Sequence, residues 1–321
     1  MPVKLQDLKA YEIVEDRDVK DMNSRGVLLR HKKSGARVCL LLNDDENKVF
    51  YIAFRTPPVN STGLTHILEH SVLCGSESFP VKDPFIELVK GSLNTFLNAI
   101  TYPDKTVYPV ASCNDKDFQN LMHVYLDAVF RPDIYKHKEI FCQEGWHYEL
   151  ENPEDDLKIN GVVYSEMKGA FSSSDDLLER EVLNSLYPDT AYRYESGGDP
   201  KNIPDLTYEE FLDFHSKYYH PSNAYIYLYG NMDPVQKLQW LDETYLSGYG
   251  KDDFGNIKYA ENHKFPFGKH ETIMCPVCGK GELLRRYSPS PKRDFIFAVM
   301  RSASMSLPVK NISSKKKKEN R

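Results

Sequence analysis

Hydrophobic and polar positions along the first two-thirds of the chain change between the spacing of strands and the spacing of helices. The apolar runs 38–42 and 49–54 flank a polar loop, and this pattern predicts a β-hairpin. The segment 94–110 turns at Pro103-Asp104 and predicts a second hairpin. The run 224–229 predicts one further, buried strand.

Helical spacing fills the stretches between these strands. It is clearest over 115–130, where apolar residues recur on one helix face: Phe118, Leu121, Met122, Tyr125, Leu126 and Val129. Thr207 is a suitable N-cap for another helix, and Asp233-Pro234 places proline in the first turn of a third. Further helices are expected at 64–73, 84–90, 135–147, around Glu166 and at 175–186. This order of elements predicts an α+β fold, a mostly antiparallel sheet covered by helices on one face.

The pattern weakens beyond Gly248, where glycine and aspartate indicate a linker. We therefore expect one domain over 1–250, followed by a linker and a disordered basic tail over 251–321. The tail contains Cys275 and Cys278, a Cys-x-x-Cys pair that resembles half of a zinc ribbon. A structural zinc site needs four ligands, and no second Cys pair follows.

Composition indicates a globular protein, since 40% of the 321 residues are hydrophobic and 27% are charged. The net charge of −6 argues against a dominant nucleic-acid surface, so no nucleic-acid partner is expected. No apolar run approaches the roughly 20 residues of a membrane helix, so no membrane association is expected either. The first residues contain no apolar signal core and no Arg- and Ser-rich stretch, which predicts a cytoplasmic location.

The strongest chemical signal is the motif His66-Ile67-Leu68-Glu69-His70. In a helix, His66 and His70 lie four residues apart on one face, where two imidazoles can bind one zinc ion. Glu69 lies beside that face and can act as a general base on a zinc-bound water. Ser61-Thr62-Gly63 supplies a helix start signal before the motif.

A hydrolytic zinc site needs a third protein ligand and an open position for water. The stretch 161–169 has the apolar positions of a helix and contains a single carboxylate, Glu166. Glu144 and Glu149 are rival ligands by residue type, and spacing alone does not exclude them.

Two blocks of this sequence resemble the catalytic domain of the pitrilysin/insulysin inverzincins, most closely the presequence-protease branch. The first block covers residues 56–112 and contains the motif, and the second is NGVVYSEMKGAFSS at 160–173. Two separate blocks in the right order make the resemblance specific. It implies that His66, His70 and Glu166 bind one catalytic Zn²⁺ ion and that Glu69 is the general base.

The resemblance also implies a substrate-binding strand. In such enzymes an Asn-Ala-x-Thr strand lies beside the zinc and pairs with an extended peptide, and here these residues are Asn98, Ala99, Ile100 and Thr101. Main-chain hydrogen bonds would hold a peptide with little demand on its sequence. From the residues alone, an ordinary sheet strand with a structural Asn98 is the favoured interpretation of this segment.

Two functions follow for a chain of this kind. The first is a zinc-dependent endopeptidase that hydrolyses unstructured peptides through a metal-activated water. The second is a peptide-binding fragment or subunit that needs a second half to close the chamber, because the resembling enzymes are much longer and the resemblance fades near residue 260.

Overall fold

The computed structural model describes residues 4–82, 84–250, 270–274 and 282–286. These residues fall into two compact units. The first unit contains the described residues up to 171 and those of 194–250, and the second contains 172–193 with the two segments beyond 269. The first unit holds every candidate site residue and is described in most detail.

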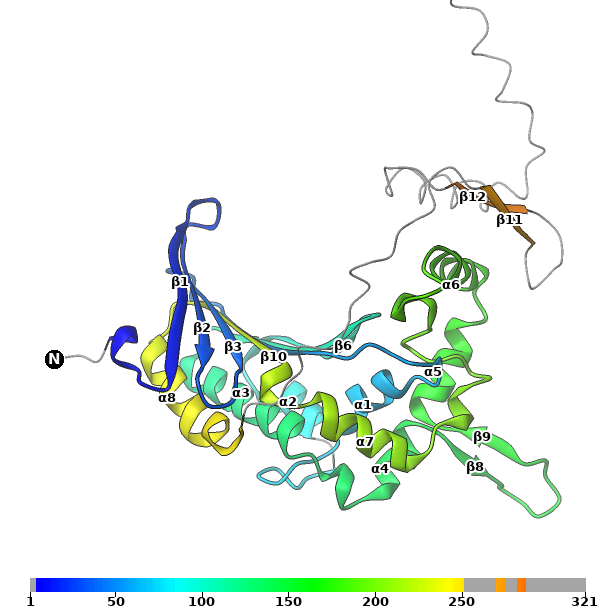
Figure 1. Ribbon diagram of the computed structural model, residues 1–321. Coiled ribbons are helices and arrows are strands. Elements are labelled where there is room, and N and C mark those ends of the chain that lie inside the picture. Colours follow the sequence, from blue (N-terminus) through cyan, green and yellow to red (C-terminus); the bar gives the residue numbers. More distant parts are fainter. Residues whose placement is uncertain (1–3, 83, 251–269, 275–281, 287–321) are drawn as a thin grey trace, which may run out of the picture. The chain divides into compact units, whose positions relative to one another are not determined.

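The first unit is built on one twisted eight-stranded sheet (Figure 1). Across the sheet the strands are β1 (Tyr11–Val19), β2 (Ser24–His31), β3 (Arg37–Leu42), β10 (Ala224–Gly230), β4 (Lys48–Arg55), β7 (Lys105–Ser112) and β5 (Asn94–Leu97). The short β6 (Ile100–Thr101) also pairs with β7. Every pairing is antiparallel except the parallel pair of β10 with β3, so the predicted sheet type is confirmed.

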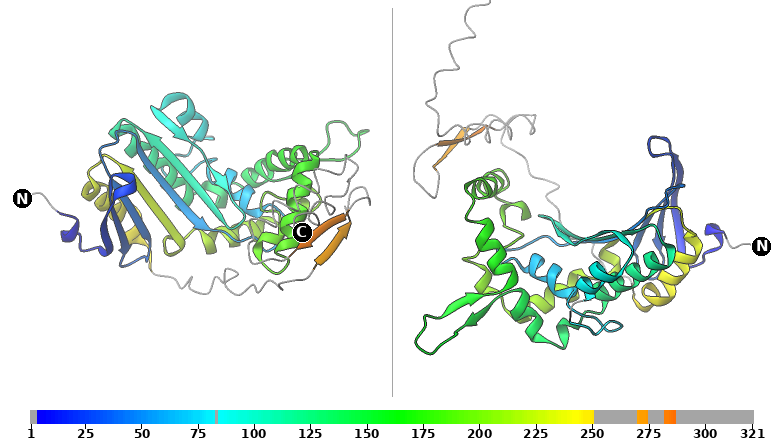
Figure 2. Two further views of the ribbon diagram at one scale, coloured as in Figure 1. Left: turned by 90° about the horizontal axis from the view of Figure 1, so that it is seen from above. Right: turned by 180° about the vertical axis from the view of Figure 1, so that it is seen from behind.

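Helices of the first unit lie on one face of this sheet, as Figure 1 and the two views of Figure 2 show. They are α1 (Leu64–Val72), α2 (Pro84–Gly91), α3 (Asp115–Phe130), α4 (Lys138–Glu144), α5 (Val162–Ala170), α7 (Tyr208–Tyr218) and α8 (Pro234–Thr244). Two further strands, β8 (His147–Glu149) and β9 (Lys158–Asn160), form a separate hairpin. None of the described helices has the length and apolar composition needed to cross a membrane.

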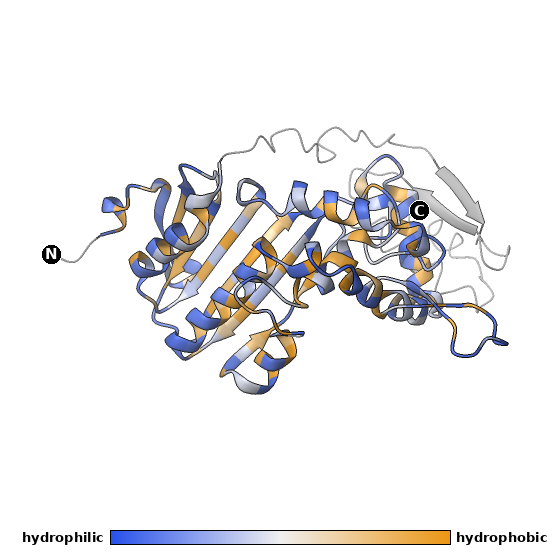
Figure 3. Cartoon of the chain, turned by 90° about the horizontal axis from the view of Figure 1, so that it is seen from below, coloured by the Kyte–Doolittle hydropathy of each residue, from blue (hydrophilic) through white to orange (hydrophobic). Residues whose placement is uncertain are grey.

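Strand alternation places the core between the sheet and the helices. In β10, Ala224, Ile226 and Leu228 are buried, whereas Tyr225 and Tyr227 point to the other face and keep part of their surface exposed. Figure 3, seen from the helix side, shows the hydrophobic strand positions that the helices cover. The sheet therefore has one face in the core and one face without helical cover from this unit.

The predicted hairpin of 38–42 with 49–54 is wrong, although both strands exist. They are β3 and β4, and β10 lies between them, parallel to one and antiparallel to the other. A strand whose alternate residues are fully buried needs hydrogen-bond partners along both edges, and β3 and β4 supply them to β10. Local spacing could not reveal this insertion, because β10 begins only at Ala224, far downstream of the loop 43–47 that was expected to close the hairpin.

Smaller differences concern element ends and burial. The helix expected at 135–147 is only α4, because a 3₁₀ turn, Asp133–Tyr135, precedes it and β8 follows. The charged hairpin of β1 and β2 was not predicted, since most side chains of β1 are exposed and lack a clear apolar alternation. The helices expected at 64–73, 84–90, 115–130, after Thr207 and from Pro234 are confirmed.

The second unit contains α6 (Ser174–Leu186), a 3₁₀ turn (Ala191–Arg193) and an antiparallel pair, β11 (His270–Met274) with β12 (Glu282–Arg286). Ser173 caps α6 by accepting a hydrogen bond from the Asp176 N–H group. The predicted half zinc ribbon, Cys275 and Cys278, lies outside the described residues.

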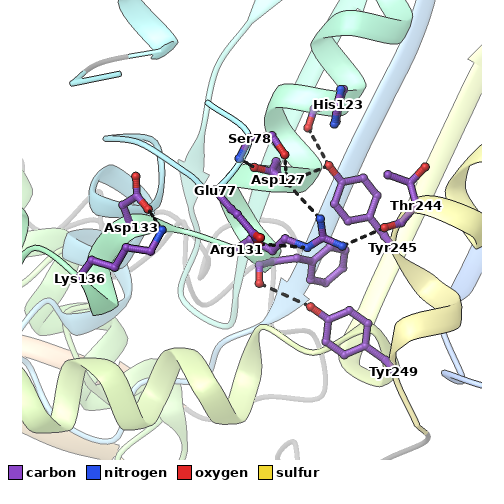
Figure 4. A network of polar contacts seen from close by, with 11 residues as sticks. Glu77, Ser78, His123, Asp127, Arg131, Asp133, Lys136, Thr244, Tyr245 and Tyr249 are labelled. Carbon is purple, nitrogen blue, oxygen red and sulfur yellow. Dashed lines mark hydrogen bonds and ion pairs between the residues drawn. The ribbon is translucent and has the colours of Figure 1, made fainter. Parts of the chain in front are cut away.

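A buried carboxylate fixes the segment that follows α1 (Figure 4). Asp127 of α3 is fully buried and accepts hydrogen bonds from the Ser78 N–H group at 2.7 Å and the Ser78 hydroxyl at 3.1 Å. The Tyr245 hydroxyl lies 3.3 Å from the same carboxylate, and Arg131 donates to the Thr244 carbonyl at 3.0 Å. The network therefore ties the chain after α1 to α3 and to the end of α8.

A second buried polar group, His215 of α7, packs in the core as a neutral imidazole. Its Nε2 donates to the Val129 carbonyl at 3.0 Å, and its Nδ1 lies 2.8 Å from the Tyr135 hydroxyl. Burial lowers the pKa of this ring from 6.5 to about 4. The unfolded chain therefore binds a proton at a pH where folded His215 does not.

We expect the free energy of unfolding to fall by about 3 kcal/mol as the pH drops from about 6.5 to about 4, because the unfolded chain gains a proton at His215 that the folded chain does not accept. Above pH 6.5 the full stability is retained, because His215 is then neutral in both the folded and the unfolded chain. In a His215→Gln variant that part of the pH dependence should be missing. Urea unfolding at several pH values measures it, with the exposed His137→Gln as control. Equal pH slopes in the His215 variant and the parent would contradict the assignment.

Candidate metal centre

Helix α1 presents the motif histidines because its other side is fixed in the core. Ile67, Leu68 and Val72 are fully buried. His66 and His70 share the opposite side, with ring centroids 4.9 Å apart and side chains 12% and 25% exposed. The helical spacing predicted from the motif is therefore realised in the structure.

Gly63, rather than a polar side chain, begins α1. It takes the N-cap position with a φ of 69°, in the left-handed region, and no side chain caps the helix. A Cβ at this position would lie 2.8 Å from the Gly197 carbonyl oxygen and 2.9 Å from the Gly198 Cα atom. Only glycine allows the helix start to approach the 197–198 backbone so closely.

Helix α5 brings Glu166 to the two histidines. Its Oε2 lies 3.7 Å from Nε2 of His66 and 3.8 Å from Nε2 of His70. All three ligand atoms lie within 4.8 Å of one another, and among the described residues this is the one group of three or more His, Cys, Asp or Glu side chains so arranged. The Glu166 side chain is 54% exposed, so the group opens to solvent.

The far nitrogen of each ring has its own acceptor. Nδ1 of His66 donates to the Gly197 carbonyl at 3.0 Å, and Nδ1 of His70 donates to Glu144 Oε2 at 3.3 Å. A carbonyl and an ionised carboxylate can only accept, so each Nδ1 carries the hydrogen. In the neutral rings both Nε2 atoms then keep their lone pairs on the side of Glu166, as a metal ligand requires.

The two rival carboxylates have different surroundings. Glu144 is buried and contacts the back of His70, and its other oxygen accepts a hydrogen bond from Gln143 at 2.8 Å. Burial raises the pKa of Glu144, but the hydrogen bonds from His70 and Gln143 outweigh burial and lower it overall. Glu149 lies on β8 and accepts from Asn160 at 3.2 Å, outside the group. Sequence reasoning weighed Glu144 only as a ligand and missed its contact with the ring.

The electrostatics of His70 reflect three neighbouring carboxylates. Burial alone lowers the pKa of its ring, but the hydrogen bond to Glu144 and the charges of Glu69, Glu144 and Glu166 act against burial. Together they raise the pKa above the ordinary value. The surroundings of His70 therefore favour a positive charge at this position.

Glu69 is buried beside the group and is held by the neighbouring strand. The Thr101 hydroxyl of β6 donates to Glu69 Oε2 at 2.5 Å. Among the described contacts no donor is assigned to Oε1 of this carboxylate. One oxygen is thus fixed and the other remains able to accept a proton.

The predicted substrate strand lies at the edge of the sheet. The N–H groups of Asn98 and Tyr102 donate to β7 carbonyls, at Pro109 (3.2 Å) and Lys105 (2.8 Å). Because an antiparallel strand alternates its hydrogen-bonding direction, the main chain of Ala99 and Thr101 turns away from β7. Within the described part of the chain no other strand pairs with this outer edge.

Comparison with protein families gives the ancestry of this arrangement. A model described as insulinase (peptidase family M16) matches residues 55–155, and one described as the peptidase M16 inactive domain matches residues 205–278. The two matches together cover more than half of the chain. The chain belongs to the M16 peptidase family. Its predicted likeness to the pitrilysin/insulysin type is confirmed.

Individual relatives of this M16 chain agree. It is 60% identical over 273 residues to Protein HypA of Clostridium perfringens. The matched region covers 85% of this chain and 28% of that protein. It is also 56% identical over 233 residues to Presequence protease 1, chloroplastic/mitochondrial, of Arabidopsis thaliana. This second match covers 73% of this chain and 22% of that protein. The chain thus spans less than a third of the length of these relatives.

A solved structure supports the fold of the M16 chain. The crystal structure of pitrilysin aligns with a TM-score of 0.57 at 20% sequence identity, over 76% of this chain and 25% of that chain. At this identity the likeness concerns the fold, and it agrees with the predicted α+β architecture.

We expect Gly63→Ala to lower the free energy of unfolding by about 2 kcal/mol or more, because the left-handed backbone and the Gly197 contact both exclude a Cβ. Urea unfolding measures the change. Gly91→Ala is the matched control, since a Cβ on Gly91 meets nothing within 4 Å. An unfolding free energy equal to that of the parent would show that the 197–198 backbone moves aside without cost.

Proposed function

We propose that this M16 chain is a zinc-dependent endopeptidase domain that hydrolyses unstructured peptides. His66, His70 and Glu166 hold one Zn²⁺ ion, and Glu69 is the general base. The observation that carries the proposal is the convergence of two imidazole nitrogens and one carboxylate oxygen within 4.8 Å, with a second carboxylate beside them on α1.

The donor set suits zinc. Zinc in hydrolytic sites takes three protein ligands from His and Glu and leaves one position for water or substrate. Ligand atoms that each lie about 2.0–2.2 Å from one ion are separated by no more than about 4.4 Å. The two separations between histidine and carboxylate, 3.7 Å and 3.8 Å, fall within this limit. The exposed side of Glu166 leaves room for a further ligand from solvent.

The chemistry divides between the ion and Glu69. When bound, zinc supplies a Lewis acid that lowers the pKa of a water molecule and polarises the scissile carbonyl. Glu69 Oε1 accepts the proton of the attacking water and delivers it to the leaving amine. The Thr101 hydroxyl keeps Glu69 Oε2 in place, so the carboxylate turns its second oxygen toward the reacting groups.

The sheet edge gives the substrate its position. The outward main chain of Ala99 and Thr101 can pair with an extended peptide as an added strand. The Asn98 side chain accepts from the Ala99 N–H group at 2.9 Å, and an incoming peptide carbonyl would replace this contact. Since Thr101 also holds Glu69, the strand that binds the peptide fixes the base at the same point.

The alternative is a peptide-binding domain that needs a second half, or a second subunit, to turn over its substrate. The observation that favours it is length, because the chain spans only 28% and 22% of two relatives of high identity. Under this alternative the metal group and the peptide edge are retained, and closure over the substrate comes from another domain.

Glu69→Gln should abolish cleavage of a quenched, unstructured fluorogenic peptide while zinc remains bound, because only proton transfer is removed. We expect at least a 10²-fold lower rate, on the order of the usual contribution of a general base. Metal content by mass spectrometry shows whether the ion is retained. Undiminished cleavage by the variant would contradict the mechanism. No cleavage by either protein, with peptide binding intact, would favour the incomplete domain.

Glu144→Gln should weaken zinc binding by about 10- to 100-fold, because the carboxylate that orients His70 is lost while the shape is kept. Competition with a chromophoric chelator measures the affinity. Glu139→Gln, an exposed carboxylate on the same helix, is the matched control. If both variants bind zinc as the parent does, Glu144 has no role in orienting the ring.

A further inference from the structure

The helix-free face of the sheet carries cations at directly opposed positions. Arg30 of β2 faces Arg37 of β3, and Arg55 of β4 faces Lys105 of β7. Directly opposed residues of an antiparallel pair share a face, and like charges there destabilise the pairing. A counter-charge or an anionic ligand near such a pair offsets this destabilisation.

Register places the four cations at one end of the sheet. Tyr225 of β10 lies opposite Arg37 and also opposite Ala53, which is two residues before Arg55. Val38 and Ile226, the next residues along β3 and β10, are buried in the core, so Arg37 and Tyr225 lie on the opposite, helix-free face. At this end the chain leaves Arg55 and reaches Gly63, where α1 begins. The cations and the candidate metal centre therefore share one end of the sheet.

The arginine groups are held in position. Arg37 Nη1 donates to the Tyr225 hydroxyl at 2.6 Å, and its guanidinium group lies 4.0 Å from the centre of the Tyr225 ring. Arg55 Nε donates to the Asn223 side chain at 3.1 Å. Burial, and then the charges of Arg55 and Arg30, lower the pKa of Arg37 despite the opposing effect of Tyr225. The opposed register of Arg30 and Arg37 places their like charges next to one another.

Among the described residues, counter-charges near Arg30 and Arg37 are few. Asp104 lies 3.2 Å from Lys105. Glu12 of β1 lies opposite Arg30 in the register, but within the described residues no ion pair within 4.0 Å is formed by Arg30 or Arg37. Glu12 is thus the one carboxylate that the register sets against Arg30 and Arg37 in the described part of the chain, which leaves an excess of positive charge at these two arginines.

We propose that Arg30 and Arg37, with Tyr225 beside them, form a carboxylate-binding site for an acidic segment of a peptide. A guanidinium group matches a carboxylate with two parallel hydrogen bonds. The Tyr225 side chain, 39% exposed, offers an aromatic surface next to it. The site deepens the proposed function, because it rests on a peptide substrate, and it selects peptides with Asp or Glu away from the scissile bond.

The test is equilibrium binding to the Glu69→Gln protein, so that cleavage does not enter. Two fluorescent unstructured peptides of equal length are compared, one with three Glu residues at one end and one with Gln in their place. We expect the acidic peptide to bind about ten-fold more tightly at low salt, as charge-assisted hydrogen bonds imply. Arg30→Gln with Arg37→Gln should reduce this ratio to about two-fold or less.

The control, matched in net charge to Arg30→Gln alone, is Arg17→Gln, an exposed arginine on β1 that pairs with Glu15. It should keep the ten-fold preference. Since Arg37 has structural contacts, Arg30→Gln alone provides a second variant, which should lower the ratio without changing the melting temperature. An unchanged ratio in the Arg30 and Arg37 variants, or equal binding of both peptides by the parent, overturns this site while leaving the proposed function standing. Binding of neither peptide overturns both.

Discussion

The candidate metal centre depends on what holds the far side of its two histidine rings. A ring on a helix can rotate and can carry its hydrogen on either nitrogen. Here the Gly197 carbonyl fixes Nδ1 of His66, and the Glu144 carboxylate fixes Nδ1 of His70. Both Nε2 atoms must then face Glu166. The ligand geometry is therefore set by two acceptors that are not themselves members of the group.

The fold fixes the motif helix at both ends so that these contacts meet. At the start, Gly63 packs against the 197–198 backbone, and the Asp199 N–H group donates to the Ser61 carbonyl at 2.8 Å. Beyond its end, Ser78 donates twice to the buried Asp127. Fully buried Ile67 and Leu68 prevent rotation of the helix about its axis. A helix held in this way presents its histidines without needing the metal to organise it.

The sequence alone predicted the helices and the local spacing of the motif, because both depend on periodicity within a few residues. It could not predict that β10 separates β3 from β4, which depends on pairing across some 170 residues. Glu166 was one of three candidate carboxylates until the resemblance selected it, and its proximity to both rings depends on how α5 packs. The Gly197 carbonyl has no side-chain signal at all. The sequence named Glu144 as a possible metal ligand because of its charge, whereas the folded chain uses its buried carboxylate to accept the hydrogen bond from Nδ1 of His70.

Charge near the histidines explains why the group calls for a cation. Glu69, Glu144 and Glu166 place three carboxylates around two rings that are neutral when they act as ligands, and each carboxylate favours a positive charge on His70. Either a second proton on a ring or a divalent ion can supply this positive charge. The raised pKa of His70 is the first of these responses. Because a proton and a metal ion compete for the same Nε2 lone pair, the carboxylates that favour one also favour the other.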